Sequence, residues 1–376
     1  MADTYTETLD KRQMSLLRLA EDMIRSIANP ALEAAYNAAR LAIMEKDAPN
    51  TQIQMSKLKE AAGKAYQEAL TDALEPLNEQ LDELAILEAG FTAKAITDFT
   101  DLAVSIPADK KLKKYVDNSV IMFHGKNEQA FTFDEYLKDF YESEARNVRN
   151  AIAAEWAAQV NTDSLPSLDD YAKRVQVVSD GLNKQSAKTL VRTGVNHFST
   201  SARMAFYKDN DDVIERMFIS VTFDNRISKI CVSIGDKYGP GSKGFTMDKP
   251  PKEGLPAYHP NCRSAVIAVP VGMDIEGDKA AIAAREGGED AFKAREDRLR
   301  TKSKVTYKGR KDDVLYAKEI SAATPIAKFL RSQPDYYQDD VLGKTLGKAF
   351  REGKVDLSQI TTDSLEPKTI KELGLN

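Results

Sequence analysis

The sequence predicts a mainly helical α+β protein with an N-terminal helical bundle, a small core of helices and strands, and a short helical C-terminal unit. Three observations predict this class. The first hundred residues are rich in Ala, Leu and Glu, and their apolar residues recur at helical spacing. Two β-branched runs follow much later, at 217–223 and 264–271, and are expected to pair as strands. Between these runs, a long segment rich in Gly and Pro predicts a loop.

The chain has 376 residues, and a typical domain length of about 150 residues divides it into two or three parts. We expect four segments along it. They are a helical region over 1–105, a core over 106–273, a charged linker over 274–320 and a small helical unit over 321–376. The linker is expected because residues 274–313 are mainly small or charged and offer few core anchors.

Four helices are predicted in the N-terminal region. Asn29, as an N-cap, and Pro30 separate the first two helices. The third helix is expected from Ser56 to Leu74, and the fourth begins at Pro76. The apolar stripes of the first, second and fourth helices are Leu16, Leu19, Met23 and Ile27; Leu32, Ala35, Tyr36, Ala39 and Ile43; and Leu77, Leu81, Leu84 and Leu87.

The core begins with a short β-like run from Val120 to Phe123. A capping box of Thr132 and Glu135 then predicts the start of a long helix. Another helix is expected to open at Ser167, and a separate one follows from Ser186 to Asp209. The first half of the core is therefore predicted to be mainly helical, and the two strands follow it.

The charge balance and the apolar pattern exclude several classes of protein. There are 53 Lys and Arg against 58 Asp and Glu, a net charge of −5, which excludes a basic histone-like protein and an acidic disordered tail. No apolar run approaches the roughly 18 residues that a membrane span needs, and the N-terminus lacks a signal-peptide pattern. We therefore expect a protein made in a cytoplasm, without a membrane partner. DNA contact remains open through local basic patches at 112–115 and 302–311.

Three soft or borderline metal ligands bracket the long loop. Cys231 stands at its entrance, and His259 and Cys262 stand at its exit. A catalytic Cys/His pair would need a third group that orients the imidazole, and the sequence shows none. The other histidines, His124 and His197, are interpreted as structural residues. Phosphate-loop, GxSxG and HExxH motifs are absent from the sequence, so no enzyme is predicted.

Three states of the two cysteines are compatible with the sequence. The first is a structural zinc site, which requires four ligands. Ser228 stands where a CxxC partner of Cys231 would be, so the fourth ligand would be Asp224 or Asp236. The second is a disulfide that closes a loop of about 32 residues and contributes about 3–4 kcal/mol, but it needs an oxidising environment. The third is a pair of reduced, buried thiols, with no cofactor at all.

Four segments carry a pattern of residues whose order and spacing match those of a known family. They are LVRTGVNHFSTSARMAFY at 190–207, FISVTFDNRISKIC at 218–231, IGDKYG at 234–239 and PAYHPNCRSAVIAV at 256–269. This set resembles the core of the Mu F-like phage minor head proteins, the phage head morphogenesis family. The tail over 328–360 is similar to a segment that follows that core in many members, so the resemblance covers roughly 130–376.

Eleven residues carry the resemblance, and two family cysteines are replaced. The family cysteine that precedes Cys231 is Ser228 here, and the one after Arg263 is Ser264, so the metal site that the family implies lacks two of its sulfur ligands. The residues that match the family motif are Arg192, Asn196, Asp224, Arg226, Cys231, Asp236, His259, Pro260, Asn261, Cys262 and Arg263.

The resemblance implies a low-copy virion protein of a tailed bacteriophage. Such a protein is assembled with the portal protein in the procapsid, contacts capsid or scaffolding proteins or copies of itself, and resides in the phage head near the portal after synthesis in the host cytoplasm. Ejection with the genome stays open. The alternative is an ejected effector or nuclease whose Cys/His loop binds zinc. A third hypothesis is a membrane-active ejection protein that uses the helices of residues 1–105.

Overall fold

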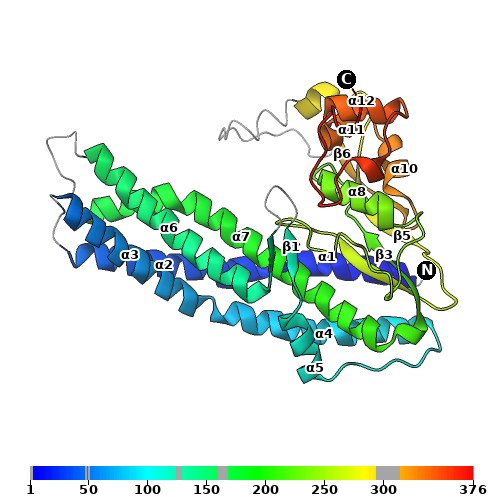
Figure 1. Ribbon diagram of the computed structural model, residues 1–376, viewed down its shortest axis with the longest axis horizontal. Coiled ribbons are helices and arrows are strands. Elements are labelled where there is room, and N and C mark those ends of the chain that lie inside the picture. The colour runs from blue at the N-terminus through cyan, green and yellow to red at the C-terminus, as the bar shows by residue number, and fades with distance from the viewer. Residues whose placement is uncertain are drawn as a thin grey trace.

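The computed structural model describes residues 3–46, 49, 51–123, 129–159, 168–293 and 314–375. A long helical bundle forms one end of the molecule, and a smaller body of strands and short helices forms the other (Figure 1). The mainly helical α+β class is thus confirmed. The elements of the bundle are α1 (Tyr5–Met23), η1 (Ile24–Ala28), α2 (Asn29–Met44), α3 (Gln52–Ala73), α4 (Glu75–Phe99), α5 (Asp109–Asp117), β1 (Ile121–Phe123), β2 (Gln129–Phe131), α6 (Phe133–Gln159) and α7 (Leu168–Asp209).

The smaller body follows α7 along the chain. Its elements are η2 (Asp211–Val213), β3 (Ile214–Ser220), α8 (Lys229–Tyr238), β4 (Ala265–Pro270), β5 (Asp278–Ala284), β6 (Leu315–Ser321), α10 (Ile326–Arg331), α11 (Asp335–Leu342), α12 (Lys344–Arg351) and η4 (Leu357–Gln359). The described strands form three two-stranded antiparallel sheets, β1–β2, β3–β4 and β5–β6.

The first two helices are joined by a π-helical turn, η1, without a break in the chain direction. Asn29 has helical backbone angles, φ −66° and ψ −47°, so the prediction that it caps a separate helix is wrong. Pro30 lacks an N–H and would crowd the carbonyl four residues before it in a regular α-helix. The wider π turn that directly precedes it changes the hydrogen-bond pattern at that point, which lets the helix continue.

The next two helices lie close to their predicted positions. The third begins at Gln52 because the Thr51 hydroxyl accepts a hydrogen bond from the backbone N–H of Gln54. On α4, the first three leucines of the predicted stripe are buried, but Leu87 is 65% exposed. The helical repeat brings position 88 inward instead, so a glutamate, Glu88, occupies the buried face.

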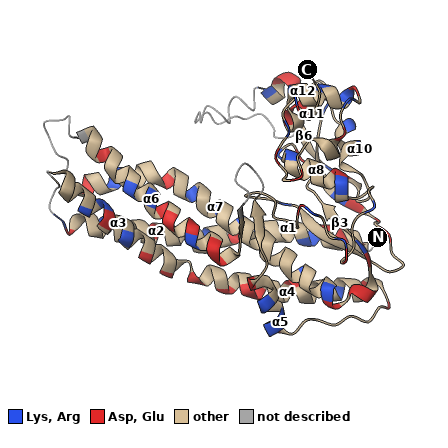
Figure 2. Ribbon diagram, in the orientation of Figure 1, with Lys and Arg blue, Asp and Glu red and all other residues tan. Residues whose placement is uncertain are grey.

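The second half of the bundle is built on α6 and α7. The predicted capping box is present, since Thr132 N–H donates to Glu135 Oε2 (2.8 Å) and Glu135 N–H donates to Thr132 Oγ1 (3.3 Å). One helix of 42 residues, about 63 Å long, replaces the two helices predicted over 167–209. Ser167 itself lies outside the described residues. The short helix α5, with its four lysines, was not predicted, and it stands out as a basic segment in Figure 2.

Two hydrophobic cores meet along α7. The first core draws on α1 to α7, so the helices before residue 105 share their core with α6 and α7 and do not form a separate unit. The second core joins the start of α1 and the ends of α4 and α7 to the strands, α8 and the C-terminal helices. The long helix α7 therefore holds the two ends of the molecule together (Figure 1).

The predicted strand pair is confirmed in β3 and β4, which pair antiparallel with Met217 opposite Ala268 and Ile219 opposite Val266. The expected linker over 274–320 is wrong in part, because β5 and β6 pair antiparallel inside it. Small alanines in β5 give a weak strand signal in the sequence, but they allow close packing, and Ala281 forms a bridge with Phe223. The basic patch at 302–311 lies outside the described residues.

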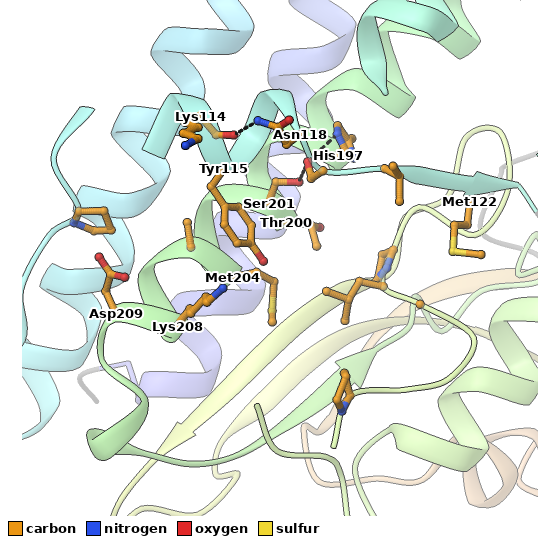
Figure 3. A pocket seen from close by; sticks show the side chains of 18 of the residues that line it. Lys114, Tyr115, Asn118, Met122, His197, Thr200, Ser201, Met204, Lys208 and Asp209 are labelled. Carbon is orange, nitrogen blue, oxygen red and sulfur yellow. Dashed lines mark hydrogen bonds between the residues drawn. The ribbon is translucent and has the colours of Figure 1, made fainter. Parts of the chain in front are cut away.

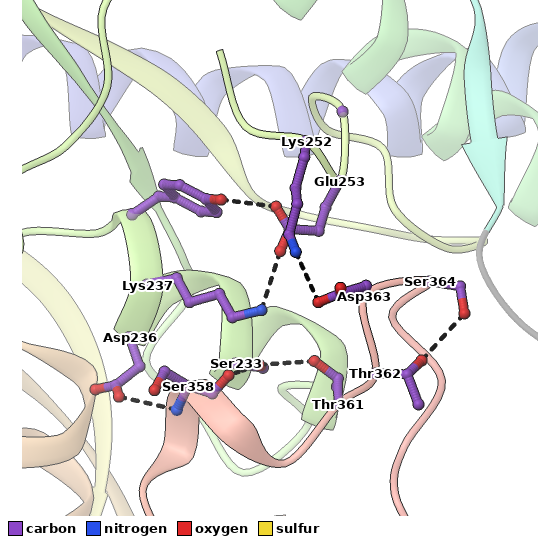
Figure 4. A network of polar contacts seen from close by, with 12 residues as sticks. Ser233, Asp236, Lys237, Lys252, Glu253, Ser358, Thr361, Thr362, Asp363 and Ser364 are labelled. Atoms are coloured by element: carbon purple, nitrogen blue, oxygen red, sulfur yellow. Dashed lines mark hydrogen bonds and ion pairs between the residues drawn. The ribbon is translucent and has the colours of Figure 1, made fainter. Parts of the chain in front are cut away.

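The C-terminal unit is attached to α8 and the long loop by polar contacts (Figure 4). The Ser233 and Thr361 hydroxyls are 2.8 Å apart, and the Asp236 carboxylate accepts a hydrogen bond from Ser358 N–H (3.0 Å). Lys252 forms an ion pair with Asp363 at 2.8 Å. Because aromatic and aliphatic residues of the unit also join the second core, it packs as part of the smaller body.

Glu144 is a buried carboxyl group in the helical core, and it makes stability depend on pH. Its side chain lies on α6, and neither oxygen has a hydrogen-bond partner of good geometry in the described chain. Burial raises the pKa of Glu144 from 4.5 to about 7. A pKa that is higher in the folded state adds stability that is complete below pH 4.5 and is lost as pH rises through about 7.

We expect Glu144→Gln to be more stable than the parent protein by about 2–3 kcal/mol at pH 8, with the difference vanishing near pH 4.5. The glutamine keeps the size of the side chain and removes the charge that burial penalises. Urea unfolding from pH 4.5 to 8 measures the effect. Glu142→Gln, on an exposed position of the same helix, should leave the pH profile unchanged. Identical pH profiles for Glu144→Gln and the parent would contradict this assignment.

Candidate Cys and His metal centre

The structure brings together the three predicted ligands, Cys231, His259 and Cys262. The first lies in the opening turn of α8, and the other two end the long loop just before β4. The two Sγ atoms are 3.8 Å apart, and His259 Nε2 is 3.0 Å from Cys231 Sγ. All three ligand atoms lie within 4.8 Å of one another, so this group could hold a metal ion. The two cysteines are free thiols in the structure.

Two serines complete the surroundings of the sulfur atoms. The Ser228 hydroxyl caps α8 by accepting a hydrogen bond from Cys231 N–H (3.0 Å), and it also lies 2.9 Å from His259 Nε2. The Ser264 hydroxyl donates to Cys231 Sγ at 3.3 Å. The two positions that carry cysteine in the resembling family therefore face the centre with hydroxyl groups. Ser228 also has a structural role that is independent of metal binding, because its side chain caps the start of α8.

His259 is oriented by a backbone carbonyl group, a partner that cannot be identified from the sequence. Its Nδ1 lies 2.9 Å from the carbonyl oxygen of Pro260. A carbonyl only accepts, so Nδ1 carries a hydrogen; in the neutral ring Nε2 then faces the sulfur atoms with its lone pair, and in the charged ring Nε2–H donates to the Cys262 sulfur. The neutral ring has the arrangement in which an imidazole binds a metal ion, with the second ring nitrogen held by an outer partner.

The pKa values of the two thiols shift in opposite directions because the thiols share one hydrogen bond. The hydrogen bond to Cys262, together with burial, raises the pKa of Cys231. Burial opposes ionisation of Cys262, but hydrogen bonds from Cys231 and His259 outweigh it and lower the pKa of Cys262. Burial likewise works against the charged form of His259, yet the contact with Cys262 raises its pKa. Cys262 is thus the sulfur that ionises first, and a thiolate is the form that binds metals.

The two carboxylates considered as a fourth ligand are held elsewhere. Asp224 accepts hydrogen bonds from both terminal nitrogens of Arg263, one of them at 2.9 Å, and also from Arg226 N–H at 3.0 Å. Asp236 lies near the end of α8 and binds Ser358 N–H. Neither joins the metal-ligating group, so the prediction of an aspartate ligand is wrong. The sequence showed a carboxylate near a cysteine, but its arginine partner lies 39 residues away.

Three further motif residues tie the end of the loop to α7. Asn196 Nδ2 donates to the backbone carbonyl of Cys262 at 2.9 Å. Asn261 Nδ2 donates to the Thr189 hydroxyl at 3.0 Å, and Arg192 reaches Asn261 Oδ1 at 3.5 Å while binding Glu21. These contacts fix the loop on the helix at the position of the centre.

Asn261 also has an unusual backbone conformation, with a φ of 60°. This left-handed region is costly for most side chains, and asparagine tolerates it better than most other residues. We expect Asn261→Gly to lose about 1 kcal/mol of stability through its hydrogen bonds alone. Asn261→Val should lose about 2–3 kcal/mol, because the β-branched side chain adds backbone strain. Guanidinium unfolding measures both, and equal losses for the two variants would contradict the role of the backbone.

The remaining predicted residues lie outside the centre. Arg226 is exposed, and its guanidinium makes no ion pair within the described segments. His197 is buried in α7 and binds Ser119, in agreement with its interpretation as structural. His124 falls outside the described residues. In the basic patch at 112–115, Lys113 is paired with Asp82 and Asp117.

Two cavities adjoin the centre. The smaller one, of about 30 Å³, is bordered by Ser228, Cys231, His259 and Ser264 and has room for a single water or ion. The larger one, of about 920 Å³, runs between α1, the end of the loop and β5. The five arginines that line this larger cavity are Arg18, Arg25, Arg192, Arg226 and Arg263.

No helix within the described segments has the length and apolar character needed to cross a membrane. Comparison with known proteins finds no match to this chain among family models, curated proteins or solved structures.

Proposed function

We propose that this chain is a minor head protein of a tailed bacteriophage that is assembled with the portal protein in the procapsid. One observation carries the proposal. Most of the residues that were assigned to the Mu F-like pattern by their order and spacing, spread over 192–263, meet in space as one connected unit, with the side chains of Arg226 and Asp236 outside it. Arg192 contacts Asn261, Asn196 contacts Cys262, and Asp224 contacts Arg263.

This unit is suited to fastening the fold. It joins α7 of the bundle to two parts of the smaller body, namely the turn before α8 and the end of the long loop. Both sulfur atoms belong to buried residues, 4% and 2% exposed for Cys231 and Cys262, which leaves little access for a large substrate. A long loop without secondary structure is costly to order, and a fastening at its two ends offsets part of that cost.

Zinc is the ion we propose for the centre when it is metal-loaded. Two thiolates bound at about 2.3 Å with tetrahedral geometry lie about 3.8 Å apart, the separation that Cys231 and Cys262 show. The imidazole of His259 would be the third ligand. A water molecule or a serine hydroxyl would complete the set, since Ser228 and Ser264 replace the two other sulfur ligands. The ion would hold the loop against α8.

The bundle offers a surface for a protein partner. Most monomers bury large apolar side chains or scatter them singly. Here several exposed ones lie at the end of α2, the start of α3 and the first half of α7, toward the end of the bundle remote from the strands (Figure 1). They are Leu41, Met44, Ile53, Val177, Val178 and Leu182. Such a surface fits docking on the portal or on a second copy of the chain.

The proposal is tested by co-expression with the portal protein encoded in the same genome. A tagged full-length chain should retain the portal through affinity and size-exclusion steps. A variant with Leu41→Lys and Val177→Lys should lose it while keeping its circular dichroism spectrum. A chain with Lys57→Glu, an exposed change on α3, is the matched control. If the portal never co-elutes with the parent chain, the proposal fails.

The second candidate is an ejected effector or nuclease that works with zinc. The observation that favours it is the larger cavity beside the centre, because two of its five arginines, Arg18 and Arg226, make no ion pair among the described residues and could bind phosphates. Elemental analysis combined with a nuclease assay separates the two functions. One equivalent of zinc together with cleavage that is lost in His259→Ala would replace the first proposal. Zinc without cleavage agrees with a structural role.

A further inference from the structure

A third cavity, of about 830 Å³, shares no lining residue with the cavity at the Cys/His centre (Figure 3). It opens between α5, the C-terminal half of α7 and the long loop at 250–256. Its volume falls within the range of about 300–1,000 Å³ that ligand sites have. The loop that the motif unit fastens at its end is therefore also one wall of this cavity.

Three hydrogen-bonded side chains form the floor of the cavity. Ser119 Oγ lies 3.1 Å from His197 Nε2 and 2.8 Å from Ser201 Oγ. The Ser119 hydroxyl donates to the Val116 carbonyl at 2.6 Å, so it must accept from both of these neighbours. Burial lowers the pKa of His197 to about 4, which keeps the ring neutral. The serine has no free proton to transfer and the imidazole already donates to it, so this is a binding floor and not a nucleophile with its base.

The floor still offers polar atoms to a ligand. Ser201 donates to Ser119, which leaves its own oxygen lone pairs to accept. The Thr200 hydroxyl lines the cavity and makes no hydrogen bond within the described segments of the chain. A ligand that covers these hydroxyls with carbon alone would leave buried polar groups unpaired, at a cost of about 1–3 kcal/mol each. A peptide backbone can pair with them.

The walls of the cavity are apolar. Met204 and Met122 line two sides, and adaptable methionine side chains suit a large apolar group. A further wall is the loop, where Pro250, Pro251 and Pro256 present carbon atoms and no N–H donors. An inserted side chain would therefore contact carbon from the methionines and from the prolines.

The rim is positively charged, although the whole chain has a net charge of −5. Lys114 from α5 and Lys208 from α7 both line the cavity, and no carboxylate of the described residues lies within ion-pair distance of either. Lys208 lies over the Tyr115 ring, 5.8 Å from its centroid. The third lysine of the rim, Lys111, is neutralised by Asp209 at 2.6 Å. Two cations thus remain for a ligand, next to apolar walls.

We propose that this groove binds a short acidic segment of a partner protein that carries a large apolar side chain. The apolar side chain fills the space between the methionines and the prolines, flanking carboxylates pair with Lys114 and Lys208, and the segment's backbone pairs with the Thr200 and Ser201 hydroxyls. The inference does not depend on the proposed phage function, because it uses none of the motif residues.

The test uses the full-length protein and a fluorescein-labelled hexapeptide, Asp-Glu-Phe-Leu-Glu-Asp, in an anisotropy titration. We expect saturable binding that weakens severalfold between 50 and 500 mM salt, since exposed charge pairs are screened. The Lys114→Glu, Lys208→Glu double variant should bind at least about tenfold more weakly. Lys110→Glu, on the same helix but away from the cavity, should bind as the parent does. Thermal unfolding of each variant checks that it is folded.

Three results would overturn the proposal. The first is equal binding of a peptide in which Ser replaces Phe and Leu, because the apolar walls would then have no role. The second is binding of laurate in the groove that excess peptide does not displace, which would make the groove an acyl-chain site. The third is no binding of the peptide to the folded parent protein at millimolar concentration.

Discussion

Glu88→Gln should lower the free energy of unfolding by about 3–5 kcal/mol, the largest effect that we expect of a single substitution. Glu88 is fully buried on α4, and its carboxylate binds two arginines. Arg203 Nε on α7 donates to one oxygen at 2.7 Å, and Arg12 Nε on α1 donates to the other at 2.8 Å. The guanidinium of Arg203 is also buried, so removing the carboxylate leaves a charge inside the protein without a counterion.

Urea unfolding followed by circular dichroism measures this loss. Asp98→Asn is the matched control, because it breaks the exposed Lys94–Asp98 pair on the same helix and should cost less than about 0.5 kcal/mol. The double variant Glu88→Leu, Arg203→Met removes both charges and should recover most of the loss. A Glu88→Gln variant within 1 kcal/mol of the parent would show that the buried pair does not hold the three helices.

Asp224→Asn should lower stability by about 2–3 kcal/mol and leave the metal content unchanged. Asp224 is buried, and its two oxygens hold the half-buried guanidinium of Arg263, which directly follows Cys262. The neutral amide keeps the shape but loses the charge that Arg263 requires. The effect is smaller than that of Glu88 because solvent reaches Arg263.

The zinc content of the variants shows whether Asp224 is a metal ligand or only the partner of Arg263. After reconstitution with zinc, elemental analysis should give the same stoichiometry for Asp224→Asn as for the parent. His259→Ala and Cys262→Ala should lose the ion, because each removes one of the three strong ligands that the described part of the chain brings together here. Loss of zinc in Asp224→Asn at a temperature where the variant is folded would restore the aspartate as a ligand.

Much of the fold could be predicted from local patterns. Apolar spacing identified the stripes of α1, α2 and α4, the Thr132–Glu135 box marked the start of α6, and β-branched runs marked β3 and β4. The misses have physical causes. A π turn absorbs Pro30 where proline usually starts a helix. The alanines of β5 carry little strand propensity, and their pairing with β6 decides their conformation.

The candidate site was predictable in its ligands but not in its surroundings. Cys231, His259 and Cys262 were identified from residue type and from their place around the loop. A sequence does not distinguish a carboxylate that binds metal from one that binds arginine, so Asp224 was misassigned. The orienting group of His259 is a backbone carbonyl, which every residue has. Glu88 did leave a signal, as a charged residue at the inward position that follows Leu84.

The central claim is that this chain is a structural component of a phage head. Quantitative mass spectrometry of procapsids and virions purified from the phage that encodes it tests this claim most directly. The account predicts peptides of the chain in both particles, at a copy number comparable to that of the portal and far below that of the capsid protein, and their absence from portal-deficient particles. Particles that lack the chain, while it accumulates free in the infected cell, would contradict it.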